Sequence, residues 1–159
     1  MKRNLLLCFL IVGLAACVTI AQKTDFKRQV DFTMEMDGFG EYKWGTSVEE
    51  IGDALIPEGS DERRNIEWFT KKNDSLNIGR ADLQSITYVF DAGRFVAVSI
   101  IAKGLSNYKA LREELEESLG KIQPINEGSF TWHLSHTNIL FSYNKQSDLA
   151  MLVIRGKGY

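Results

Sequence analysis

Cysteine and proline are both scarce in this chain of 159 residues, which contains two of each. Both cysteines, Cys8 and Cys17, lie within the first 21 residues. The remaining chain, residues 22–159, therefore has no disulfide, no thiol nucleophile and no cysteine metal ligand of its own. It must then be held together by its hydrophobic core alone. No low-complexity linker divides it, so we expect residues 22–159 to form one domain.

Concentrated positive charge and chemical motifs are missing too. Removing Lys2 and Arg3 from the 19 basic residues leaves 17 against 21 acidic ones, and the basic residues are scattered. Nucleic-acid binding requires a concentrated basic patch, so no nucleic-acid partner is expected. The sequence contains no phosphate-binding glycine loop, calcium loop or G-x-S-x-G turn, and we expect no cofactor and no metal.

The first 21 residues are typical of a bacterial secretion signal. Lys2 and Arg3 precede an apolar run from Leu5 to Ala21, and a polar stretch begins at Gln22. A membrane-spanning helix needs about 20 consecutive apolar residues, and this run is slightly shorter. The sequence therefore predicts export to the cell envelope, where the protein is periplasmic or secreted.

Two processing sites remain open. Cleavage after Ala21, with the small residue Thr19 two positions earlier, leaves Gln22 as the new N-terminus and residues 22–159 as a free protein. Residues 14–17, Leu-Ala-Ala-Cys, instead resemble a bacterial lipobox, in which Cys17 carries a lipid and tethers the protein to a membrane. A lipid anchor at Cys17 is the only membrane contact that we expect.

The pattern of apolar residues predicts two helices and seven strands. The first helix begins at Thr46 or Ser47, each of which can start a capping box, and stops near Pro57. The second is capped by Ser106 or Asn107 and ends at Gly120. Period-two alternation or turn-bounded apolar runs predict strands over residues 30–36, 64–70, 83–90, 94–103, 129–134, 138–144 and 148–155.

Strands joined by short turns pair in antiparallel fashion. The predicted fold class is therefore α+β, with one antiparallel sheet of about six or seven strands and both helices on a single face. The order helix, three strands, helix, three strands is consistent with a duplicated αβββ unit. Such a sheet presents its other face to solvent or to a partner.

Residues 39–51, Phe-Gly-Glu-Tyr-Lys-Trp-Gly-Thr-Ser-Val-Glu-Glu-Ile, contain a distinctive motif. This segment resembles the W-G-[TM]-S-x-E-E-[VI] opening of small exported bacterial proteins, many of them lipoproteins of unknown function. More distantly, the chain resembles β-lactamase-inhibitor-like and outer-membrane-assembly small lipoprotein folds. The resemblance implies an α+β fold and an envelope location, and it carries over no catalytic residue. From the residues themselves, we expect Trp44 to anchor the chain and Gly45 to permit a turn.

His133 and His136 are the only histidines and hence the candidates for an active site. Residues an odd number apart on a strand point to opposite faces, which argues against a shared metal ion. A small envelope hydrolase using His133 or His136 remains an alternative. It predicts a cleft in which a histidine lies within hydrogen-bond reach of an acid.

Aromatic residues are the stronger candidates for binding. Trp132 shares one face of its predicted strand with Phe130 and Leu134, and Tyr143 shares one face of the next strand with Ile139 and Phe141. Trp68 and Tyr88 can join them from the first half. They either pack under the helices as core or form a partly exposed patch on the uncovered face of the sheet, where Trp and Tyr are favoured contact residues. The sequence thus favours a non-enzymatic binding module with an unknown protein or ligand partner; a hydrolase, or an inhibitor or immunity-type protein, is the alternative.

Overall fold

The computed structural model describes residues 32–33, 35–121, 123–126 and 128–159. The predicted secretion signal and the alternative lipidation site at Cys17 lie outside the described residues, as does the start of the strand predicted over 30–36. Within the described part of the chain, no helix has the length and apolarity needed to cross a membrane.

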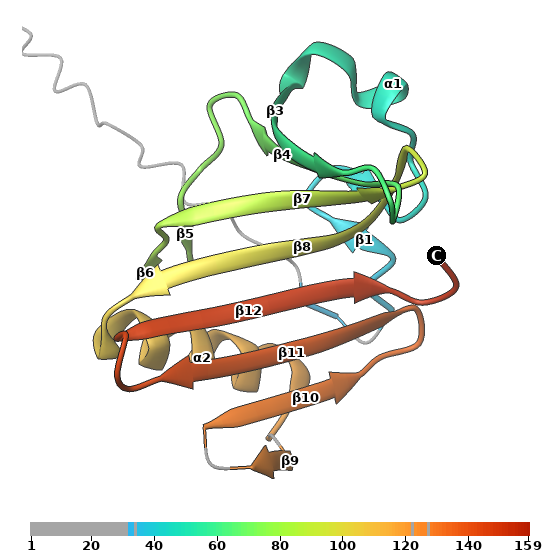
Figure 1. Ribbon diagram of the computed structural model, residues 1–159. Helices are drawn as coiled ribbons and strands as arrows, with labels where there is room; N and C mark the ends of the chain where they lie inside the picture. Colours follow the sequence, from blue (N-terminus) through green and yellow to red (C-terminus); the bar gives the residue numbers. More distant parts are fainter. Residues whose placement is uncertain (1–31, 34, 122, 127) are drawn as a thin grey trace, which may run out of the picture.

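One antiparallel sheet dominates the fold (Figure 1), with eight strands in the order β3-β4-β7-β8-β12-β11-β10-β9. Their bounds are Leu55–Asp61 (β3), Ile66–Lys71 (β4), Ser85–Asp91 (β7), Arg94–Lys103 (β8), Gln123–Asn126 (β9), Ser129–His133 (β10), Thr137–Asn144 (β11) and Leu149–Gly156 (β12). The predicted α+β class with a large antiparallel sheet is therefore confirmed. The strand count was too low, because the two edge strands β3 and β9 were not predicted.

The two halves of the chain have matching topology. In each half a helix precedes four strands of the main sheet, and the last strands of the halves, β8 and β12, pair side by side at the centre. Each predicted αβββ unit is thus one strand short of the observed arrangement. The apolar strand predicted near the C-terminus, β12, is central as expected.

Helix α2 (Leu105–Leu119) covers the second half of one face, which we call the inner face. Leu111 and Leu115 are buried, and Tyr108 and Leu119 pack beside them, as the predicted stripe requires. The helix ends at Gly120, whose φ of +83° favours glycine. Its N-cap is Gly104 rather than Ser106 or Asn107. The Asn107 side chain instead accepts a hydrogen bond from the Asp82 backbone N–H.

The first half of the inner face is covered by the N-terminal hairpin of β1 (Gly38–Phe39) and β2 (Tyr42–Lys43). Its Phe39 and Tyr42 rings make edge contacts with Tyr88, with centroids 6.2 and 6.1 Å apart. Phe32 and Met36 are buried as the alternating pattern predicts, but the described residues of 30–36 form no strand.

The predicted placement of the first helix was wrong. Helix α1 spans only Val48–Ile51, and a 3-10 turn over Gly52–Ala54 leads into β3, which contains Pro57. A single turn buries too little apolar surface to cover a sheet. Instead α1 lies at one end of the sheet, where the Val48 N–H donates to the Gly93 carbonyl of the β7–β8 turn at 2.9 Å. A further small hairpin, β5 (Asn77–Ile78) and β6 (Ala81–Asp82), packs against α2.

Candidate functional site

The outer face of the main sheet, opposite α2, faces the viewer in Figure 1 and carries no helix in the part of the chain that the structure describes. Antiparallel partners point to the same face of a sheet, so the strand register fixes which side chains lie there. We call the central group the open face; it comprises Trp68, Thr70, Thr87, Val89, Ala97, Ser99, Ile101, Thr131, Leu140, Ser142, Met151 and Val153.

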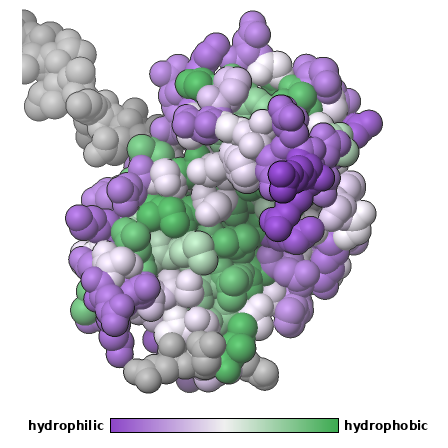
Figure 2. All heavy atoms as spheres, in the orientation of Figure 1, coloured by the Kyte–Doolittle hydropathy of each residue, from purple (hydrophilic) through white to green (hydrophobic). Residues whose placement is uncertain are grey.

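The open face combines exposed apolar side chains with hydroxyl groups and has no charged member. Leu140 and Met151 are 39% and 38% exposed, and Ile56 of the neighbouring edge strand is 41% exposed. Figure 2 shows hydrophobic side chains across the middle of this face and hydrophilic ones around it. The margin carries the charges, including Asp91 and Arg155. This surface is therefore neutral and partly apolar at its centre, and polar at its rim.

The predicted binding aromatics do not lie together. Trp68 is half-buried on the open face. Trp132 and Tyr88 are only 7% and 1% exposed, because they belong to the inner face and pack in the core. Both are therefore excluded from an exposed aromatic patch.

Tyr143 is half-buried and belongs to a second surface feature, on the α2 side of the sheet. A groove of about 700 Å³ lies between α2 and the open end of the β10–β11 hairpin. We call it the Tyr108–Tyr143 groove; its lining includes Leu105, Tyr108, Arg112, Phe130, Tyr143 and Lys145. The Tyr108 ring stacks on Tyr143 with centroids 4.7 Å apart and planes 22° apart, and on Phe141 at 5.2 Å and 19°.

Polar contacts hold the groove side chains in place. Arg112 donates from Nε to Glu116 Oε1 at 3.0 Å, and its guanidinium lies 5.0 Å from the Phe130 ring centroid. The hydrogen bond and ion pair with Glu116 raise the pKa of Arg112. The Tyr143 hydroxyl donates to Asp148 Oδ1 at 2.6 Å, and this bond raises the pKa of Tyr143 because ionisation would break it. The groove is therefore an ordered aromatic and basic surface.

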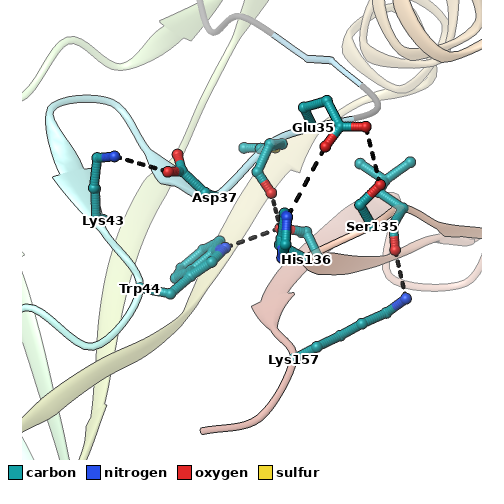
Figure 3. Close-up of polar contacts among 10 residues, drawn as sticks. Glu35, Asp37, Lys43, Trp44, Ser135, His136 and Lys157 are labelled. Atoms are coloured by element: carbon teal, nitrogen blue, oxygen red, sulfur yellow. Dashed lines mark hydrogen bonds and ion pairs between the residues drawn. The ribbon is translucent and has the colours of Figure 1, made fainter.

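Trp44 fastens the N-terminal segment to the sheet, as its place in the sequence motif suggested (Figure 3). Its Nε1 donates to Thr137 Oγ1 at 2.8 Å, and that hydroxyl donates to the Met36 carbonyl at 2.6 Å. Gly45 follows with a φ of +83°. Ser47 then caps α1 in a complete capping box with Glu50, which selects the second of the two predicted frames. The motif therefore has a structural explanation.

The candidate hydrolase residues are arranged unfavourably for catalysis. Beside the Trp44 anchor, Ser135 Oγ donates to Glu35 Oε1 at 3.1 Å, whereas His136 Nε2 lies 3.9 Å from Glu35 Oε2 (Figure 3). The acid thus stands between the hydroxyl and the imidazole, whereas activation of a serine requires the imidazole between hydroxyl and acid. Both the His136 and Glu35 side chains are well exposed, at 62% and 77%. In this cluster the imidazole is therefore not in contact with the serine hydroxyl.

The other histidine is not part of that cluster. His133 Nδ1 lies 2.8 Å from Oδ1 of Asn138, its partner on the neighbouring strand. Among the described residues, no group of three or more metal-ligating side chains is close enough to hold an ion.

Sequence reasoning missed Leu140, Met151 and Val153 as surface residues. Met151 and Val153 belong to a strand that is apolar on both faces, a pattern that indicates a central strand but does not say which face a helix covers. Leu140 stands between the polar residues Asn138 and Ser142, so its face does not read as apolar. Tyr108 was recognised only as part of the apolar stripe of α2, because the sequence does not show that Tyr143 lies beside it.

Comparisons of the chain with protein-family models, with curated proteins and with solved structures find no match. The resemblance of residues 39–51 to small exported proteins therefore remains a prediction.

Proposed function

We propose that this protein is a non-enzymatic binding module that uses the open face to hold a protein partner. The observation that carries the proposal is a large sheet with one face covered and the other left with exposed Leu140, Met151 and Ile56. The partner surface that fits it is uncharged and apolar at its centre.

The whole outer face, made of the open face and its margin, suits a protein partner in size. The sheet has eight strands. At about 4.8 Å between strands and about six residues of 3.3 Å along each, its outer face offers roughly 800 Å², of which the open face is the central part. A standard protein interface takes about 800 Å² from each partner. A small ligand would need a concave pocket instead, and the open face is formed by the outward side chains of a continuous sheet.

The chemistry of the face also suits a protein partner. Interface centres are depleted in charge and enriched in aromatic residues, methionine and arginine, with a polar rim. The open face has Trp68 and Met151 and no charged side chain, and Arg155 lies at its margin. One acid touches this face at the β3 edge: the Glu58 carboxylate accepts from the Thr70 hydroxyl at 2.9 Å, so a partner must leave that carboxylate in water or offer it a donor.

We propose, from the sequence, that the protein works in the cell envelope after cleavage at Ala21 or lipidation of Cys17. Mass spectrometry of the mature N-terminus distinguishes the two products. A free or cyclised Gln22 excludes the lipoprotein form, and a diacylglycerol-modified Cys17 excludes the free one. An unprocessed Met1 contradicts both.

A capture experiment with matched variants tests the binding proposal. Leu140→Arg combined with Met151→Glu places opposite charges on the open face without changing the net charge. Captured from envelope extract, the partner should bind this double variant at least about thirtyfold more weakly than the wild type, which is the loss expected for hot-spot residues.

The control introduces the same charges elsewhere. Ser118→Arg combined with Ser106→Glu alters two exposed serines of α2, which lie on the other side of the sheet. This variant should capture the partner as the wild type does. Equal capture by all three proteins, or equal loss in both variants, contradicts the proposal. If the captured protein is a second copy of this chain, light scattering will show a dimer that the open-face variant abolishes.

A further inference from the structure

The Tyr108–Tyr143 groove lies between α2 and the end of the β10–β11 hairpin; it shares Ser142 with the open face, and its other lining residues lie outside that face. Its volume of about 700 Å³ is comparable with that of small-molecule sites, which range over roughly 300–1,000 Å³. It is too small for a protein surface. Its occupant should therefore differ in kind from the partner of the open face.

The aromatic side chains of the groove favour a flat ring. Tyr108 stacks almost parallel to both Phe141 and Tyr143, with planes 19° and 22° apart. Phe141 is fully buried, whereas Tyr108 and Tyr143 are half-buried and line the groove. Aromatic rings prefer offset-stacked or edge-to-face partners at centroid distances of about 4.5–7 Å. A planar ring in the groove would extend the stack.

The charged side chains that line the groove, Arg112 and Lys145, are both basic. Two acids lie beside them: Glu116 pairs with Arg112, and Asp148 accepts the Tyr143 hydroxyl. These acids fix the direction of the groove side chains but are not part of its lining. Guanidinium and ammonium groups carry several N–H donors each, so these side chains can bind a ligand carboxylate through charge-assisted hydrogen bonds beside their existing contacts.

We propose that the Tyr108–Tyr143 groove binds a small aromatic carboxylate. The ring of the ligand lies against Tyr143 and Tyr108, and its carboxylate is directed to the basic side chains of the lining. This inference is independent of the proposed protein partner.

Calorimetric titration of the purified protein with three probes tests the proposal. Phenylacetate carries the ring and the charge, phenylacetamide lacks the charge, and cyclohexylacetate lacks the flat ring. Phenylacetate should bind the tightest, and each of the other two should bind roughly tenfold more weakly. Absence of phenylacetate binding, or equal affinity for phenylacetamide, overturns the proposal.

Variants locate the binding. Lys145→Glu changes an exposed turn residue and should abolish the preference for phenylacetate over phenylacetamide. Tyr143→Leu removes the stacking surface and should weaken phenylacetate binding roughly tenfold. If Tyr143→Leu fails to fold, Lys145→Glu still decides, because unchanged affinity in that variant contradicts the site.

The open-face variant with Leu140→Arg and Met151→Glu should bind phenylacetate as the wild type does. The same variant is expected to lose the protein partner, so the two proposals fail or succeed separately. Loss of phenylacetate binding in a folded open-face variant would mean that phenylacetate binds the open face, and it would overturn the groove proposal.

Discussion

Thr137 shows at the residue scale how the N-terminal segment is held. Among the described residues, it is the one polar side chain that is fully buried. Its hydroxyl accepts from Trp44 Nε1 and donates to the Met36 carbonyl, so both capacities of the hydroxyl are used. Nothing in the sequence around Thr137 indicates this role, since the contact joins positions 93 and 101 residues apart.

Thr137→Val should therefore destabilise the protein by about 2–6 kcal/mol. The substitution keeps the shape of the side chain but leaves the Trp44 N–H and the Met36 carbonyl without partners, each of which costs about 1–3 kcal/mol. Urea unfolding followed by tryptophan fluorescence measures the change.

The control for this prediction is Thr131→Val. Thr131 also donates its hydroxyl to a carbonyl, that of Ile139 at 2.9 Å, but it lies half-buried on the open face where water can replace it. The Thr131→Val substitution should change the free energy of unfolding by less than about 1 kcal/mol. Equal effects of the two substitutions would show that the buried hydrogen bonds of Thr137 contribute no more to the free energy of unfolding than an exposed one does.

Tyr143 provides a pH-dependent prediction at the same scale. Its folded pKa is raised because the hydroxyl donates to Asp148. The stabilising contribution is therefore fully present below the ordinary tyrosine pKa of about 10, and it is lost as pH rises through the folded pKa. Asp148→Asn removes the negative acceptor and should lower the pKa of Tyr143 towards its ordinary value.

Titration of the tyrosine ring carbons by NMR measures that pKa, and Tyr143→Phe assigns the signal. Asp148→Asn is compatible with the backbone, because residue 148 has a φ of +54° and asparagine also adopts left-handed conformations. An unchanged pKa of Tyr143 in the Asp148→Asn variant would show that the hydrogen bond does not cause the shift.

At the scale of elements, the two prolines lie in the two edge strands. Pro57 is in β3 and Pro124 in β9, and these strands end the sheet on either side. Edge strands present unpaired backbone groups that other chains can add to, and proline removes a donor there. Register shifts accompany both edges, at Pro57/Gly59 and at Ser129/Phe130. The edges are therefore protected, which leaves the open face as the surface for partners.

Replacing both prolines by valine should create edge-to-edge association. Pro57→Val with Pro124→Val restores a backbone donor to each edge strand and adds a strand-forming residue. Light scattering should then show oligomers that grow with protein concentration. A double variant that remains as monodisperse as the wild type would mean that other features protect the edges.

The same edge strands explain where prediction of the fold ended. The six strands expected after residue 60 are present, because each combines an apolar run with clear turn residues. Strand β3 was not predicted, since Pro57 and Gly59 are unfavourable for strands and a bulge separates them. Four-residue β9 is too short to show a period. Strands β3 and β9 form because they pair with β4 and β10. The local sequence does not indicate this pairing.

At the scale of the whole molecule, the N-terminal hairpin and α2 together cover the inner face and leave the outer face open. The sequence predicted one covered and one uncovered face, but it did not predict which aromatics lie on each. Tyr88 and Trp132 are core residues because the register pairs them with Val98 and Ile139, which are fully buried. Register is set by the complete sheet. The sequence could therefore predict that one sheet face is uncovered, but it could not predict which residues lie on that face.

Site-specific photo-crosslinking tests the central claim most directly. A benzophenone side chain replaces Leu140 on the open face in one protein and the exposed Glu117 of α2, on the other side of the sheet, in another. Both proteins are irradiated in intact cells. The open-face claim predicts a discrete crosslinked protein from position 140 and none from position 117. The same product from both positions, or a product from position 117 alone, would contradict it.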